Sequence, residues 1–120
     1  METTELKSAL AQFTGTEHYY RLYPKVVLTD GAKYLAESAG CYWLMDLYAS
    51  YLARLDPNGD SFTCLKLTLQ GTSAQIVIED GNTQLLTKQH VEYTDFPLEQ
   101  FMLYAVWSSE FWVVMLTSEY

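Results

Sequence analysis

Apolar side chains near the start of the chain recur with helical spacing. Between residues 5 and 13 they stand at positions i, i+3, i+4 and i+7, which predicts an amphipathic helix. Residues 29–31 (Thr-Asp-Gly) indicate a second helix start, because a capping oxygen is followed by an acid. Good helix formers then run from residue 32 to about residue 55. Gly40 divides them, so we expect one bent helix or two helices in succession.

Residues 41–52 are apolar almost all the way round. A helix of this kind is normally buried on most sides, so we expect it to be the central helix, lying against a sheet. Its strongly polar positions are spaced by four and share one edge, and they are Asp46, Ser50 and Arg54. We expect this edge to face solvent. The alternative is that Asp46 faces a cleft and acts there as an acid or base.

The hydrophobic period changes to two after the turn signal at residues 56–60. Residues 97–107 also fit helical spacing, but the β-branched and aromatic residues around them favour a strand. The segments 16–24 and 26–28 are too irregular or too short to assign to helix or strand. The strands we expect are 62–69, 74–79, one between 84 and 93, 101–107 and 111–116.

These elements predict an α+β fold in which N-terminal helices pack on one face of a four- or five-stranded antiparallel sheet. We expect a single domain over residues 1–120, with a helical half at 1–55 and a strand-rich half at 61–120. Large aromatic residues expected on the uncovered face would favour a homodimer, and these are Trp107, Phe111 and Trp112.

The composition limits the classes of partner. The chain has 120 residues with 15 acidic and 7 basic side chains, a net charge of −8. This balance argues against binding to nucleic-acid backbones or to anionic membranes, because both depend on Lys and Arg. The sequence shows neither a membrane span of about 20 apolar residues nor a leader pattern, so we expect a cytoplasmic location.

The acidic residues are concentrated in the second part of the chain. Residues 67–120 carry a net charge of −6, which leaves −2 for residues 1–66. We therefore expect the sheet to offer an acidic surface to a protein partner with a basic surface. Solubility is the simpler explanation of the same charge. The expected surface consists of Glu79, Asp80, Glu92, Asp95, Glu99 and Glu110.

Tyrosines form a second candidate contact. Seven of the ten tyrosines lie between residues 19 and 51, and tyrosine provides a large, rigid contact area with a polar tip. Rings that line the core are the alternative. The aromatic patch expected to touch a partner is Tyr19, Tyr20, Arg21 and Tyr23.

No metal or cofactor site is expected. The two histidines and two cysteines lack the close spacing of zinc ligands. Cys41 follows Gly40, but its apolar neighbours indicate an inert, buried thiol. Neither a phosphate-binding loop nor a serine-nucleophile signature is present. An enzyme or small-molecule sensor would need a pocket between the central helix and the sheet, with a polar lining of Tyr34, Tyr42, Asp46 and His90.

Five runs of sequence resemble a family of short bacterial proteins of unknown function, namely residues 13–21, 28–37, 39–44, 93–98 and 118–120. The resemblance implies an accessory protein of plasmids, phages and related mobile elements, and it assigns no catalytic residue. Together with the acidic surface, it leads us to expect a non-enzymatic protein-binding module that inhibits nucleic-acid-handling or defence machinery of the host. A small enzyme or small-molecule sensor is the alternative.

Overall fold

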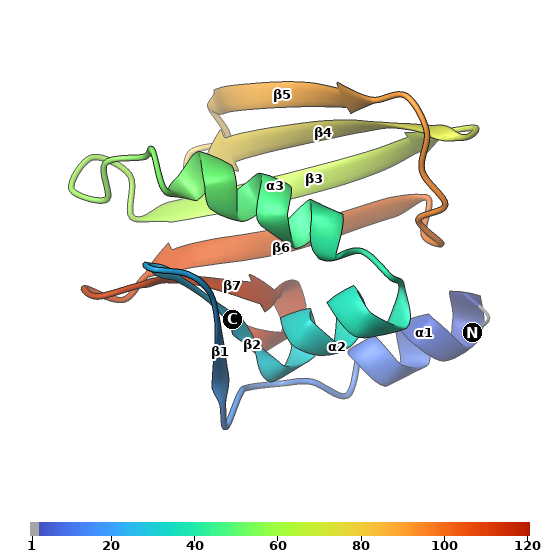
Figure 1. Cartoon of the computed structure of the whole chain (residues 1–120), viewed down its shortest axis with the longest axis horizontal. Coiled ribbons are helices and arrows are strands. Elements are labelled where there is room, and N and C mark those ends of the chain that lie inside the picture. The colour runs from blue at the N-terminus through green and yellow to red at the C-terminus, as the bar shows by residue number, and fades with distance from the viewer. Residues whose placement is uncertain (1–2) are drawn as a thin grey trace.

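The computed structural model describes residues 3–120, which form an α+β fold around one sheet (Figure 1). The strands are β1 (Tyr19–Tyr23), β2 (Val26–Thr29), β3 (Phe62–Gln70), β4 (Ser73–Asp80), β5 (Leu85–Val91), β6 (Gln100–Trp107) and β7 (Trp112–Leu116). Their order across the sheet is β1-β2-β7-β6-β3-β4-β5. Neighbouring strands are antiparallel except β2 and β7, which are parallel, so the sheet is mixed.

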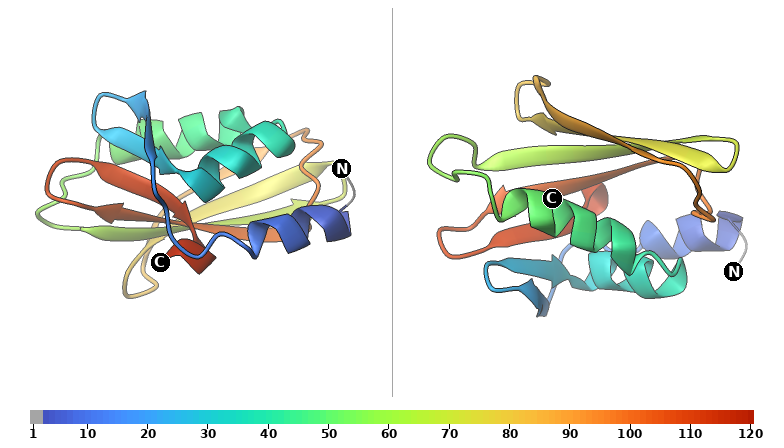
Figure 2. Two further views of the ribbon diagram at one scale, coloured as in Figure 1. Left: turned by 90° about the horizontal axis from the view of Figure 1, so that it is seen from below. Right: turned by 45° about the horizontal axis from the view of Figure 1, so that its top comes forward.

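The helices of the described residues lie unequally on the two sides of the sheet. They are α1 (Thr3–Leu10), α2 (Asp30–Ser38), α3 (Tyr42–Leu52) and the 3₁₀-helix η1 (Thr117–Glu119). Helices α2 and α3 cover one face, while η1 and the C-terminus lie on the other side (Figure 2, left). Helix α1 packs beside α2 and buries Leu6 and Leu10.

The break between α2 and α3 confirms two helices in succession. Gly40 has a φ of +61°, a left-handed conformation that glycine adopts without steric cost. The N–H of Cys41 donates to the carbonyl of Ala36 at 2.9 Å, which satisfies one of the last carbonyls of α2. The chain then turns directly into α3.

Helix α3 is the central helix, as its composition predicted. Leu44, Met45, Tyr48 and Leu52 are buried, and they belong to the same core cluster as the alternate residues Leu65 and Leu67 of β3. Asp46 and Ser50 are exposed on the opposite edge of α3, and Arg54 is exposed just after its end, which confirms the solvent-facing edge.

The sheet is larger than predicted, and it is not purely antiparallel. Strands β1 and β2 come from residues 19–29, within the half expected to be helical. Strand β2 is buried along its whole length, because it lies between β1 and β7 and has α2 above it. A short apolar run without alternation is typical of such an interior strand, but it does not differ in pattern from a buried helical turn.

Two of the tryptophans do not lie where they were expected. Trp112 is only 2% exposed and belongs to the core under the helices, and the half-buried ring of Trp107 packs against it at 5.6 Å. Both residues pair across β6 and β7 on the helix-covered face. The prediction that they lie on the uncovered face is therefore wrong. Residues 100–107, by contrast, form strand β6, as favoured over a helix.

Candidate functional site

The face of the sheet that points away from α2 and α3 carries the strongest candidate surface. Leu65 and Leu67 of β3 point to the helices, so the alternate residues point the other way, and the pairing register extends this assignment across all seven strands. The bare face, as we call it, includes Tyr19, Arg21, Val27, Phe62, Cys64, Lys66, Thr68, Gln70, Ser73, Gln75, Val77, Glu79, Leu85, Lys88, His90, Gln100, Met102, Tyr104, Val106, Val113 and Met115, and the rings of Phe111 and Tyr120 pack against it.

Apolar residues form two adjacent rows across the bare face. One row joins Val27, Val113, Val106 and Phe62 of four neighbouring strands. The next contains Met115, Tyr104 and Cys64. Val27 and Cys64 are buried, and the other five residues of the rows are partly exposed. An apolar sheet face that α2 and α3 leave uncovered is a candidate interaction site.

Three aromatic rings pack together on the bare face. The ring centres of Tyr104 and Phe62 lie 5.1 Å apart. The ring centre of Tyr120 lies 5.4 Å from that of Phe62 and 5.5 Å from that of Tyr104. The residue Tyr120 is nevertheless 74% exposed. The cluster thus holds one large aromatic side chain in a defined position while leaving most of its surface accessible.

The predicted aromatic patch is divided between the two faces, because β1 is a strand and its side chains alternate. Tyr19 and Arg21 lie on the bare face, where the guanidinium of Arg21 stands 5.8 Å from the ring centre of Phe111. Tyr20 points the other way and donates to Asp30 at 3.1 Å. Tyr23 is half-buried beside an irregularity in the pairing of β1 and β2.

The six predicted acidic residues lie at two opposite ends of the sheet. At one end, Asp80 accepts backbone N–H bonds within its own turn, and Glu79 pairs with Lys66 at 2.9 Å. Glu110 lies in the β6–β7 turn at this end, because Val106 pairs with Phe62 beside the end of β4. Glu92, Asp95 and Glu99 occupy the segment that joins β5 to β6 at the other end.

The residues of the alternative pocket do not come together. Tyr42 and Asp46 are exposed on α3, while His90 lies on the bare face on the opposite side of the sheet. Tyr34 packs against Phe13 at 5.3 Å. The hollow beneath α3, against β4 and β5, measures about 50 Å³, whereas small-molecule sites typically measure roughly 300–1,000 Å³.

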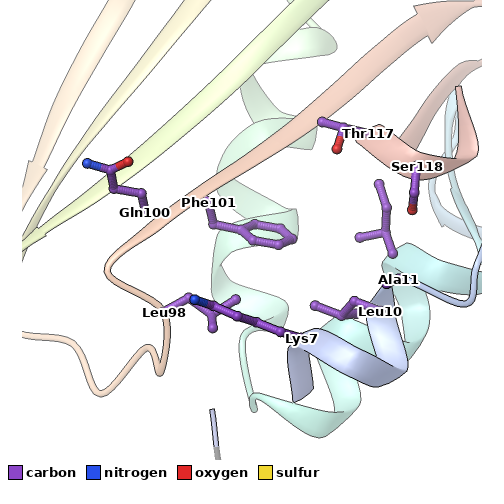
Figure 3. Close-up of a pocket in the computed structure, with 9 residues that line it drawn as sticks. Lys7, Leu10, Ala11, Leu98, Gln100, Phe101, Thr117 and Ser118 are labelled. Atoms are coloured by element: carbon purple, nitrogen blue, oxygen red, sulfur yellow. The ribbon is translucent and has the colours of Figure 1, made fainter. Parts of the chain in front are cut away.

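A cleft that the sequence did not indicate opens between α1 and the start of β6 (Figure 3). Strand β7 ends at Leu116, opposite Leu103, so residues 100–102 have no partner strand on that side. Leu10 and Phe101 line the gap together with Leu98, and its volume is about 280 Å³. The cleft is small and open, and its lining is largely apolar.

The N-terminus of α2 is held by a carboxylate from the far end of the chain. Glu119 accepts hydrogen bonds from the hydroxyl of Thr29 at 2.6 Å, from the N–H of Gly31 at 3.0 Å and from the N–H of Leu116 at 2.9 Å. A carboxylate at this position satisfies helix N–H donors and the positive end of the helix dipole. Glu119 therefore joins β7 to the start of α2.

Asp30 forms a second polar junction beside it. Its carboxylate accepts the backbone N–H of Glu17 at 2.9 Å and the hydroxyl of Tyr20. The N–H bond from Glu17 is the main cause that lowers the pKa of Asp30 below its usual value, and the same carboxylate raises the pKa of Tyr20. These contacts fix the segment before β1 against α2.

This pKa shift predicts how stability depends on pH. A carboxyl group with a lowered folded pKa stabilises the fold above its unfolded pKa of about 3.9, and that stability disappears as the pH falls through the folded value. We expect Asp30→Asn to lower the urea midpoint at pH 7 and to have a much smaller effect near pH 3. A difference between the two proteins that stays constant from pH 7 to pH 3 would contradict this assignment.

The thiols lack the properties of catalytic nucleophiles. Cys41 is fully buried, and this burial raises the pKa of its thiol to about 12. Burial also raises the pKa of Cys64. Within residues 3–120, no group of three or more His, Cys, Asp or Glu side chains is placed to hold a metal ion. None of the helices in this range has the length and apolar character needed to cross a membrane.

Comparison with known proteins gives one finding. Residues 4–120 match a family of unknown function, DUF6876. Neither the curated proteins nor the solved structures include a match to this chain. The runs at 13–21, 28–37 and 118–120, which carried the resemblance, meet at the N-terminus of α2, where Asp30 and Glu119 form their contacts. Because the match covers nearly the whole length, the chain belongs to the DUF6876 family.

Proposed function

We propose that this chain is a protein-binding module that contacts its partner through the bare face. The observation that carries the proposal is the pair of apolar rows across β2, β7, β6 and β3, on the side that α2 and α3 leave open. Most members of the two rows are partly exposed, and Met102 beside them is 37% exposed. A partner that covered this face would remove apolar surface from water, which is favourable.

The composition of the bare face suits a protein partner. Tyrosine, phenylalanine, methionine and arginine are enriched at protein interfaces, and the bare face combines all four. The molecule measures 39 × 32 Å along its two longest axes. Figure 1, which looks down the shortest axis, shows strands β3 to β6 side by side. A stable interface needs roughly 800 Å² on each partner, so a partner would have to cover a large part of the sheet.

The sequence also led us to expect a mobile-element inhibitor that binds a basic partner. That expectation concerns the acidic residues at the ends of the sheet. Glu92, Asp95 and Glu99 are exposed in one segment, where they are free to meet Lys or Arg of another protein. This contact is separate from the bare face, and it stays a prediction. If this contact forms with a nucleic-acid-handling enzyme, the chain should inhibit that enzyme, and the inhibition should be sensitive to salt.

The proposal predicts the effect of two new charges on the bare face. Met102→Glu with Val106→Glu places carboxylates within the apolar rows and their border, where a docked partner would have to bury them at high cost. We expect this variant to fold and to lose the proteins that the wild-type chain captures from a bacterial lysate. Quantitative mass spectrometry of the captured proteins measures the loss.

A matched control introduces the same charge elsewhere. Ser50→Glu with Ala53→Glu changes two exposed positions on the helical side. Circular dichroism should show that both variants are folded, and the control should retain the wild-type partners. Identical sets of captured proteins for all three chains would contradict a binding role for the bare face.

A further inference from the structure

We infer that the partner of the bare face is an acidic protein surface, one in which carboxylates flank apolar side chains. This inference rests on the proposed function and adds the chemistry of the partner. It follows from a charge separation that the total of −8 conceals. Among the 7 basic and 15 acidic residues of the chain, the bare face holds three bases, Arg21, Lys66 and Lys88, and one acid, Glu79.

The bare face therefore has a formal charge of +2, which leaves −10 for the rest of the molecule. Its only acid, Glu79, is already paired with Lys66 at 2.9 Å, within the face itself. Arg21 and Lys88 are exposed on the two outermost strands, β1 and β5. They stand on either side of the apolar rows, so a partner covering those rows would bring its rim close to both.

Complementary charge at the rim of an interface sets partner choice and association rate more than it adds affinity. The apolar rows would accept many partners of suitable shape. Arg21 and Lys88 favour those whose rim is acidic, and the −10 on the remaining surface repels acidic molecules from every other side. The charge separation thus directs an acidic partner to one face.

A second copy of the chain fits these charges poorly. Two bare faces packed symmetrically would each contribute +2 to the same interface. A copy that offered its acidic side would leave its own bare face open for the next copy, which gives an unlimited chain instead of a closed dimer. An external acidic partner avoids both outcomes.

Nucleic acid fits the aliphatic part of the face poorly. Binding to phosphates depends on many basic contacts, whereas one of the three bases here is already paired and the chain as a whole is acidic. Val106 and Val113 are partly exposed, and their aliphatic side chains match apolar side chains better than they match stacked bases.

The test uses a phage-displayed library of random peptides of about a dozen residues, selected on the full-length chain. We expect the selected peptides to combine Asp or Glu with Leu, Phe or Trp. Synthetic peptides from the selection should bind Arg21→Glu with Lys88→Glu roughly tenfold or more weakly at low salt. The difference should shrink at about 0.5 M salt. Lys7→Glu with Arg54→Glu makes the same charge change away from the bare face and should bind nearly as the wild type does.

The outcomes separate this inference from the proposed function. Suppose that the binding of the selected peptides depends on Met102 and Val106. If these peptides show no excess of Asp or Glu, or bind Arg21→Glu with Lys88→Glu as well as the wild type, the inference of an acidic partner is overturned and the binding face is retained. Selection of peptides that tolerate Met102→Glu with Val106→Glu would overturn both. If sizing chromatography showed a dimer that Met102→Glu with Val106→Glu abolishes, the partner of the bare face would be a second copy of the chain and not an acidic protein. If the chain bound a fluorescent 20-nucleotide RNA or DNA and Met102→Glu with Val106→Glu abolished that binding, the bare face would be a nucleic-acid site.

Discussion

Replacing Gly31 with alanine should lower the free energy of unfolding by about 2 kcal/mol, although alanine is the better helix former by about 1 kcal/mol. A Cβ at this position would stand 2.5 Å from Oε1 of Glu119 and 2.6 Å from Cδ1 of Leu116. The carboxylate cannot simply rotate away, because it accepts three hydrogen bonds, two of them from Thr29 and Gly31 at the start of α2. Moving it leaves helix donors without partners.

Gly15 provides the matched control for this experiment. A Cβ there would meet no atom within 4 Å, so Gly15→Ala should change stability by no more than a few tenths of a kcal/mol. Urea unfolding followed by circular dichroism measures both variants. If Gly31→Ala proved as stable as the wild type, the contact between Glu119 and α2 would not form as described.

The second large effect concerns the buried hydroxyl pair beneath α3. The hydroxyls of Tyr48 and Thr63 lie 2.7 Å apart, and both residues are fully buried. Tyr48→Phe leaves the Thr63 hydroxyl without a partner, which should cost about 1–3 kcal/mol of stability. Thr63→Val should cost a similar amount for the same reason.

A double-mutant cycle tests the pair directly. The double variant Tyr48→Phe with Thr63→Val removes both hydroxyls, so neither is left unpaired in the core. Its loss of stability should therefore be smaller than the sum of the losses of the two single variants. Urea denaturation of the four proteins gives the coupling energy. Strictly additive effects would show that the two hydroxyls do not depend on each other.

The sequence predicted those elements whose pattern has one structural meaning. The period of two at residues 62–69 predicted a strand, which is present. Gly40 predicted one bent helix or two helices in succession, and the structure has two. Residues 26–29 did not, because four consecutive buried residues fit an interior strand and a buried helical turn equally well. Their assignment depends on β7, which comes about 85 residues later.

The candidate site was predicted only in part, because its charge depends on register. The count of acidic residues in the second half of the chain was correct, but a count along the sequence does not say which face each residue occupies. Most of these carboxylates lie in turns and in the segment between β5 and β6, whereas Lys66 and Lys88 lie on the bare face. One available signal was the near absence of polar residues from 101–107, since an antiparallel strand with a solvated face should alternate.

The parallel pairing of β2 with β7 has a consequence for how the protein forms during synthesis. Strand β2 is buried between β1 and β7, yet β7 leaves the ribosome long after β2 has been made. Until then β2 has one unpaired edge, and α2 and α3 have no complete sheet to cover. We expect the nascent chain to stay incompletely folded until β7 emerges, and the unpaired edge of β2 to be open to chaperones until then.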